Sequence, residues 1–243
     1  MARLATEKRE KALCAALELF WRKGWHATST RDLERALDMR PGSIYAAFGS
    51  KEGLFREALD RYAATTQAEL EAATEGRAPL AGLAEFARRL GARMVDPGTT
   101  NACLLVKTLL ECAGDEPELR AEADRLLSRF EARLAARFEA ARAAGEVPAE
   151  ADPAKLARRM QSRLMGLRAY AQRAGAEREG EHHAGERHSA DGRDDMLSTE
   201  RLRKAMNDDL RGERTVGVQS SWGELSSLGG FVGAVQMPAR QAS

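Results

Sequence analysis

The side chains best suited to chemistry in this sequence gather in residues 28–51, and their types suit anion binding. The hydroxyl residues Thr28, Ser29 and Thr30 stand at the start of an expected helix of residues 30–37. Backbone N–H groups at a helix N-terminus, joined by short hydroxyl side chains, suit a phosphate group. The alternative is that these hydroxyls only cap the helix.

Two basic side chains frame a second short helix, expected at residues 41–48. Arg40 directly precedes it and could reach a phosphate or the edge of a guanine. Lys51 follows Ser50, the expected cap of the next helix, so its ammonium adds charge beside the N–H groups of that helix end. The segment therefore predicts a surface that binds the backbone of double-stranded DNA.

The helix expected at residues 41–48 is too short, and carries too few large side chains, to build a core. Ile44 and Phe48 are four residues apart and face inward, while Gly42 and Ala46 allow a close approach of the backbone. These features predict insertion into the DNA major groove. The predicted DNA-contacting residues are Thr28, Ser29, Thr30, Arg40, Pro41, Gly42, Ser43, Tyr45, Ala46 and Lys51.

The composition favours an all-α protein whose basic surface is local. Charged residues make up 31% of the 243 residues, yet the net charge is only +1. Ala, Leu, Arg and Glu dominate up to about residue 175, and the alternation typical of strands is missing. No signal peptide is visible, and no apolar run approaches the ~18 residues that span a bilayer. We therefore expect a cytoplasmic protein without membrane contact.

Apolar residues recur at helical spacing as far as residue 172. The pattern predicts helices at residues 6–23, 30–37, 41–48, 51–73, 80–94, 101–112, 118–144 and 154–172. The helix at 101–112 is unusually apolar and is expected to be largely buried. Beyond residue 175 the chain is polar and rich in Gly and Ser, which predicts a mostly disordered tail.

Residues 10–62 strongly resemble the TetR family of bacterial transcriptional regulators. The matching motifs are TSTRDL at 28–33, GSIY at 42–45 and FGSKE at 48–52, preceded by AALELF at 15–20. The resemblance implies an N-terminal three-helix helix-turn-helix domain at 1–62 and a helical ligand-binding and dimerisation domain at 63–175, with the tail at 176–243. It also implies phosphate contacts at Tyr45 and Lys51.

The same resemblance implies a homodimer that binds an inverted-repeat operator, most often as a repressor, and is released by a small-molecule effector. Candidate effector-pocket residues are Phe86, Met94, Leu105, Leu109, Met160 and Met165, for each of which ordinary core packing is the alternative. Candidate dimer-interface residues on the last two helices are Leu126, Phe130, Leu134, Leu156, Leu164 and Leu167.

Other classes of protein fit the sequence less well. No Gly-rich phosphate loop follows a strand and no nucleophile elbow is present, so we predict no enzyme and no cofactor. His182, His183 and His188 could bind a metal, but their low-complexity setting favours chance composition, and no metal site is predicted. A helix-turn-helix module of another type, or an interaction adaptor without a small-molecule effector, stays open.

The three cysteines do not form a disulfide framework. Cys103 and Cys112 are nine positions apart, so on one helix they would lie about 13.5 Å apart along the axis, on opposite faces. The simpler interpretation of Cys14, Cys103 and Cys112 is that they are small apolar residues, and a redox sensor is the alternative.

Overall fold

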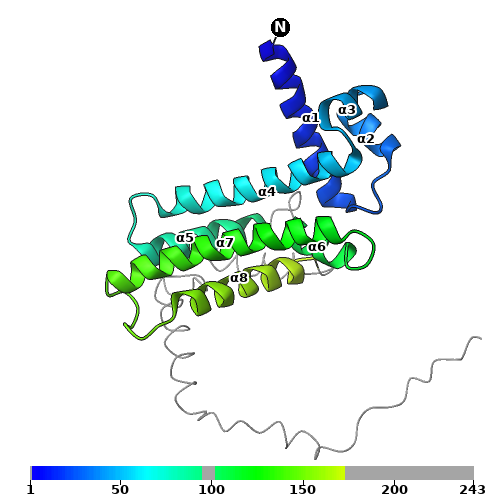
Figure 1. Cartoon of the computed structure of the whole chain (residues 1–243). Helices are drawn as coiled ribbons and strands as arrows, with labels where there is room; N and C mark the ends of the chain where they lie inside the picture. Colours follow the sequence, from blue (N-terminus) through cyan, green and yellow to red (C-terminus); the bar gives the residue numbers. More distant parts are fainter. Residues whose placement is uncertain (1, 95–101, 173–243) are drawn as a thin grey trace, which may run out of the picture.

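The computed structural model describes residues 2–94 and 102–172, and every regular element in these ranges is an α-helix, which confirms the all-α prediction (Figure 1). The predicted tail and the three histidines at 182, 183 and 188 lie outside the described residues. The helices are α1 (Ala2–Lys23), α2 (Thr30–Leu37), α3 (Pro41–Phe48), α4 (Lys51–Thr74), α5 (Pro79–Met94), α6 (Leu104–Glu111), α7 (Pro117–Ala143) and α8 (Pro153–Tyr170).

Two helix boundaries differ from the prediction by more than two residues. Thr6 was expected to cap the first helix, but α1 begins at Ala2 and Thr6 lies inside it. α6 begins at Leu104 and is only eight residues long. Its burial is also one-sided, because Leu110 is 76% exposed while Leu104 and Thr108 on the other face are buried.

Local sequence explains the other boundaries. Pro41, Pro117 and Pro153 each open a helix, where the missing N–H costs no hydrogen bond. Gly49 ends α3 with a φ of 76°, a conformation that glycine adopts without steric cost. Ser50 then caps α4 by accepting a hydrogen bond from the backbone N–H of Gly53.

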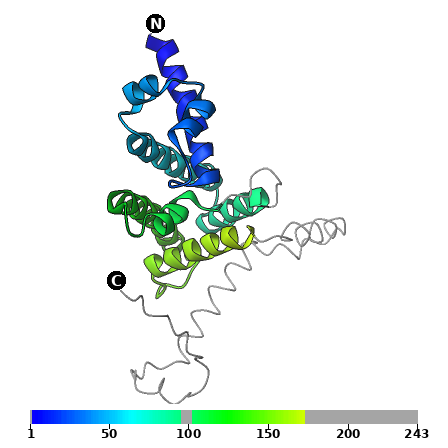
Figure 2. The same cartoon turned by 90° about the vertical axis from the view of Figure 1, so that its right-hand side faces the viewer.

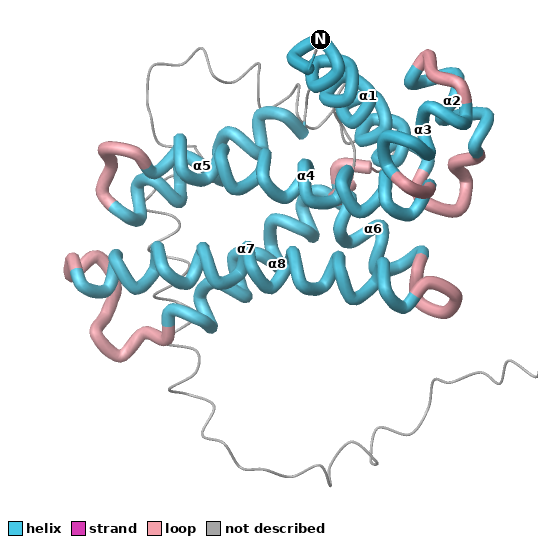
Figure 3. The backbone as a smooth tube through the Cα atoms, turned by 45° about the horizontal axis from the view of Figure 1, so that its top comes forward, coloured by secondary structure: helices cyan, strands magenta, loops and turns pink. Residues whose placement is uncertain are grey.

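The helices form a head and a body joined by one long helix. In Figures 1 and 2, α1, α2 and α3 gather at one end of the molecule, and Figure 1 shows α4 running from them across the body. The remaining helices pack beneath α4, with α7 and α8 side by side (Figure 3). α4 is continuous from Lys51 to Thr74, so the predicted boundary between domains at residue 62 falls within a helix.

Two clusters of buried side chains hold this arrangement together. The first joins the head to α6 and to the start of α7, and in it Ile44 and Phe48 of α3 meet Leu33, Leu37 and Leu54. The second joins the far half of α4 to α5, α7 and α8. Because the first cluster crosses between head and body, the two parts are packed together and not merely tethered.

Across residues 2–94 and 102–172, no helix combines the length and the apolar character that crossing a membrane requires.

Candidate DNA interface and effector pocket

A tight turn sets the angle between α2 and α3. Asp38 closes α2 in the left-handed conformation, with a φ of 49°, and its backbone N–H donates to the carbonyl of Glu34. Asp tolerates this conformation better than most residues, although glycine is its usual occupant. Arg40 then has extended backbone, and Pro41 starts α3. The turn between the two helices is therefore three residues long.

The turn leaves one side of α3 exposed. Ile44 and Phe48 are buried at 2% and 6% exposure, as their spacing predicts. Tyr45 and Ala46 between them and residues 41–43 before them are exposed, with Tyr45 at 43%, whereas Ala47 is half-buried. Of the predicted DNA-contacting residues, seven are exposed, namely Ser29, Arg40, Pro41, Gly42, Ser43, Tyr45 and Ala46, and Thr30 and Lys51 are half-buried.

Thr28 corrects the prediction. Its side chain is buried, at 1% exposure, and its hydroxyl donates a hydrogen bond of 2.6 Å to the carbonyl oxygen of Gly24. A hydroxyl that is buried and already bonded cannot receive a phosphate. Thr28 therefore closes the loop after α1, and its side chain is not available to contact DNA.

Ser29 does act as a helix cap. Its hydroxyl oxygen accepts from the backbone N–H of Asp32, and the Asp32 carboxylate accepts from the backbone N–H of Ser29, which completes a capping box. Lys23 lies 2.8 Å from the Asp32 carboxylate. The hydrogen bond from Lys23, followed by those from Ser29, holds the pKa of Asp32 well below its usual range.

Lys51 has a structural contact of its own. Its ammonium donates to the carbonyl oxygen of Trp25 at 2.9 Å and lies 4.1 Å from the centroid of the Trp25 ring. Burial lowers the pKa of Lys51. An ammonium has three N–H donors, so this contact leaves two of them for a phosphate.

Two residues that the sequence prediction missed position α3. Arg9 of α1 donates to both carboxylate oxygens of Glu57 at 2.7 Å, and its guanidinium lies 4.7 Å from the centroid of the Phe48 ring. At Gly53, a side-chain Cβ would overlap the carbonyl oxygen of Phe48. α3 and α4 therefore approach more closely than any residue other than glycine would allow.

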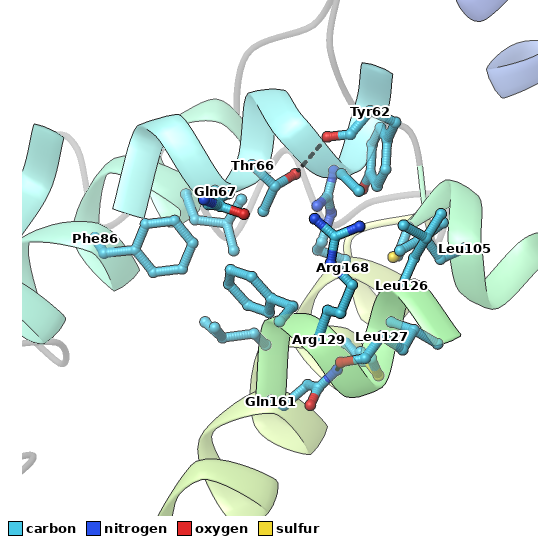
Figure 4. Close-up of a pocket in the computed structure, with 16 residues that line it drawn as sticks. Tyr62, Thr66, Gln67, Phe86, Leu105, Leu126, Leu127, Arg129, Gln161 and Arg168 are labelled. Atoms are coloured by element: carbon cyan, nitrogen blue, oxygen red, sulfur yellow. Dashed lines mark hydrogen bonds between the residues drawn. The ribbon is translucent and has the colours of Figure 1, made fainter. Parts of the chain in front are cut away.

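A cavity lies in the body, between α4, α7 and α8 (Figure 4). Three predicted pocket residues line it, namely Phe86, Leu105 and Met165. Met94 lines a second, adjoining cavity. The lining of neither cavity includes Leu109 or Met160, because Met160 packs into the second buried cluster and Leu109 is half-buried elsewhere on α6.

The first cavity contains polar groups that no apolar pattern could reveal. Arg129 and Arg168 line it together with Gln161, whose amide N–H donates to the carbonyl of Leu127 at 3.1 Å. The amide oxygen of Gln161 is buried and has no hydrogen-bond partner among the described residues. The buried Tyr62 hydroxyl lies near the Cys103 thiol but makes no hydrogen bond of normal geometry.

α6 connects this cavity to the head. Leu105 of α6 lines the cavity, and near the other end of the helix the Glu111 carboxylate accepts a hydrogen bond from the backbone N–H of Trp25 at 2.7 Å. Lys107 donates to the carbonyl oxygens of Trp21 and Arg22, at 3.3 and 3.0 Å. A displacement of α6 would therefore move the end of α1.

The structure corrects most of the predicted dimer interface. Four of its leucines are buried within the chain itself, namely Leu126, Leu134, Leu156 and Leu164. Phe130 is half-buried and contacts Phe86, with ring centroids 5.9 Å apart. Only Leu167 is exposed, at 40%. The apolar stripes of α7 and α8 face each other and the body, because each helix must first bury that stripe within its own chain.

The cysteines are free thiols. Cys103 and Cys112 are buried, whereas Cys14 is exposed. Burial raises the pKa of Cys112 to about 11, with smaller contributions from Glu111 and Glu116. A thiol reacts as its thiolate, so this environment disfavours a redox role for Cys112.

Known proteins match both parts of the chain. The family model for bacterial regulatory proteins of the tetR family matches residues 12–58, and the model for the tetracyclin repressor-like C-terminal domain matches residues 79–184. The HTH-type transcriptional repressor ComR of Escherichia coli is 32% identical over 164 residues, which cover 65% of this chain and 77% of that protein. The HTH-type transcriptional repressor BdcR of Escherichia coli is 46% identical over 56 residues, 23% of this chain and 28% of that protein.

Solved structures share the fold. A cysteine mutant of the TetR family transcriptional regulator CifR, complexed with 26-bp double-strand operator DNA, has a TM-score of 0.61 and 27% sequence identity. The similarity covers 83% of this chain and 94% of that one.

Proposed function

The chain belongs to the TetR family of bacterial regulatory proteins, and from this premise we propose that it represses transcription as a homodimer that a small-molecule effector releases from its operator. The observation that carries the DNA-binding part is the exposed side of α3, where Ser43, Tyr45 and Ala46 project from a helix whose other side is buried. We propose a cytoplasmic location, since bacterial operators lie in the cytoplasm.

The proposed contacts divide into two kinds. Ser43 and Ala46 face the groove, while Tyr45 and Lys51 bind phosphates and fix the orientation of α3. Ser29 and Thr30 offer the N-terminus of α2 to a further phosphate. Thr28 has no such part, because its hydroxyl is buried and bonded to Gly24.

A gel shift on DNA flanking its own coding sequence tests this assignment. The wild-type protein should bind that DNA more tightly than random DNA, with an affinity that falls steeply as salt rises. Tyr45→Ala should weaken binding about tenfold on all sequences, because a phosphate contact carries no base information. Tyr170→Ala is the matched control, since Tyr170 is similarly exposed, at 48%, at the far end of α8. Equal affinity for random DNA would contradict the proposed function.

The proposed effector acts through α6. A ligand in the cavity would press on Leu105, and α6 would carry the displacement to the end of α1 through Lys107 and Glu111. The ligand weakens operator binding only if it binds the displaced arrangement more tightly than the DNA-bound one.

The dimer interface is proposed on the outer sides of α7 and α8. α7 exposes Ser128 and Ala132 there, and α8 exposes Ser162 and Ala169. Such small side chains allow the helices of a second copy to approach closely. Pairing of two heads doubles the number of bases read and fits an inverted repeat.

Light scattering after size exclusion tests the interface. Ala132→Arg should give monomers, because it places a charge at the centre of the contact. Ala140→Arg is the control, since Ala140 is also exposed on α7 but lies about two turns nearer its C-terminus and about 80° around the helix axis from Ala132. A dimer that persists in Ala132→Arg would contradict this placement.

A further inference from the structure

We propose that the effector is an organic anion with an apolar body, whose charged head is bound by Arg168 of α8 and Arg129 of α7. The inference rests on the proposed function and deepens it, because it names the chemical class of molecule that the cavity takes.

The charge of the cavity lining is one-sided. Its walls are mostly apolar, and its two ionisable groups of fixed charge are the guanidiniums of Arg129 and Arg168, with no carboxylate in the lining. Within residues 2–94 and 102–172, neither guanidinium forms an ion pair within 4 Å of a carboxylate. Glu122 acts electrostatically on the same region, but its carboxylate is already paired with Arg125. Two cations beside apolar walls favour an anion.

Arg168 lies beside two aromatic rings and forms no ion pair with an acid among the described residues. Its guanidinium carbon lies 5.7 Å from the centroid of the Trp21 ring and 5.8 Å from that of Tyr62. Cation–π contacts of this kind do not use up N–H donors, so the N–H groups of Arg168 are left to bind a carboxylate in bidentate fashion. Figure 4 shows the guanidiniums of Arg129 and Arg168 in the space beneath α4.

Neutral polar groups on the same wall suit the rest of the ligand. The amide oxygen of Gln161 and the hydroxyl of Tyr62 are buried without partners among the described residues. A buried group without a hydrogen bond is unfavourable, so a ligand that bonds to either one gains affinity. The apolar side chains of Phe86, Leu90 and Phe130 offer contact to a hydrocarbon or aromatic body.

The space available limits the size of the ligand. The first cavity has a volume of about 60 Å³ and the adjoining cavity about 220 Å³. Tyr62, Thr66, Leu90 and Arg168 line both, so the two spaces adjoin across these side chains. Both volumes are small, which favours a compact ligand, since pockets for drug-sized ligands reach about 300–1,000 Å³. Glu69 in the second cavity is paired with Arg93 and does not offset the charge of Arg168.

Isothermal titration of the full-length protein with matched probes tests the proposal. Octanoate and octanamide have the same shape and differ in charge, as do benzoate and benzamide. At least one carboxylate should bind tenfold or more tightly than its own amide, because hydrogen bonds to charged groups are stronger. Octylamine should not bind. The proposal is overturned if each amide binds as tightly as its carboxylate, or if octylamine binds best.

Variants separate the charge from mere packing. Arg168→Met should weaken carboxylate binding about tenfold or more and leave amide binding within about twofold, since Met keeps most of the apolar stem. Arg129→Met provides a second test should Arg168→Met fold poorly. Arg158→Met is the matched control on α8, because Arg158 is exposed and lies outside both cavities. Equal losses for acid and amide in both cavity variants would overturn the proposal.

Gel shifts on the same samples keep the two hypotheses apart. Specific operator binding without any preference for carboxylates would overturn the anionic class and leave the repressor function standing. Carboxylate binding without specific operator binding would support an anionic ligand but contradict the proposed repressor function. The ligand would then not be an effector.

Discussion

The contact between Gly24 and Glu111 can be measured by a double-mutant cycle. Gly24 has a φ of 87°, and a Cβ there would overlap the Glu111 carboxylate, which accepts the 2.7 Å hydrogen bond from the backbone of Trp25. Through this hydrogen bond the end of α6 contacts the loop that follows α1. The cycle combines Gly24→Ala with Glu111→Ala.

Each single change has a magnitude that follows from these contacts. Glu111→Ala removes a hydrogen bond to a charged acceptor and leaves the N–H of Trp25 unpaired, for a loss of about 2 kcal/mol in the free energy of unfolding. Gly24→Ala costs about 1–2 kcal/mol for the left-handed backbone. It also displaces the Glu111 side chain, so its total cost is about 3–4 kcal/mol.

The double variant should cost less than the sum of its parts. With Glu111 already removed, Gly24→Ala costs only its backbone conformation, so the double variant loses about 3–4 kcal/mol and the coupling free energy is about 2 kcal/mol. Urea unfolding at one fixed protein concentration measures all four proteins, because dimerisation makes stability depend on concentration. Strict additivity, within about 0.5 kcal/mol, would refute the contact.

Glu139→Ala is the matched control for this cycle. Its carboxylate pairs with Arg142 on an exposed face of α7, and its side chain is 53% exposed. Exposed pairs of this kind contribute less than about 1 kcal/mol, so the control should stay close to the wild type.

Three further predictions concern other parts of the chain. Ser29→Ala should lower the free energy of unfolding in urea by about 1 kcal/mol, because it removes the hydroxyl that caps α2. Ser29→Thr should keep most of this free energy. Equal losses in the two variants would contradict the role of Ser29 as a cap. Hydrogen bonds from Arg88 and Arg89 lower the pKa of Glu85 from 4.5 to about 2. The ionised Glu85 carboxylate therefore stabilises the fold above about pH 4.5, and this stabilisation is lost as the pH falls toward 2. Glu85→Gln should reduce the fall in melting temperature over this pH range. An unchanged fall would contradict the prediction. A thiol reagent at pH 8 should modify exposed Cys14 quickly and Cys112 slowly, because burial raises the pKa of Cys112 to about 11. Mass spectrometry of the labelled peptides measures which cysteine is modified first. Faster labelling of Cys112 would contradict the prediction.

The head was largely predictable because its signals are local. Pro41 and Gly49 bound α3, and the spacing of Ile44 and Phe48 marks its buried side. A cap, a proline, a terminal glycine and a 3.6-residue period each act within a few residues, so they can be recognised without knowing what packs nearby.

The errors arose where burial depends on distant elements. Thr28 has the residue type of a phosphate ligand, but the packing of the loop after α1 places it in the interior. The leucines of α7 and α8 form an apolar stripe, and the sequence pattern does not tell whether it faces a second copy or the core of its own chain. Both kinds of contact need the same spacing of apolar residues.

The sequence alone therefore determined which elements form and which class of molecule the head binds, since both depend on short-range spacing and on the motif in residues 28–51. Only the tertiary structure decided that Glu111 holds Trp25 across 86 positions, and that Arg129 and Arg168 face one cavity without a carboxylate in its lining. Such groupings arise from the packing of whole helices, so charges that look like ordinary surface residues in sequence become partners in a site.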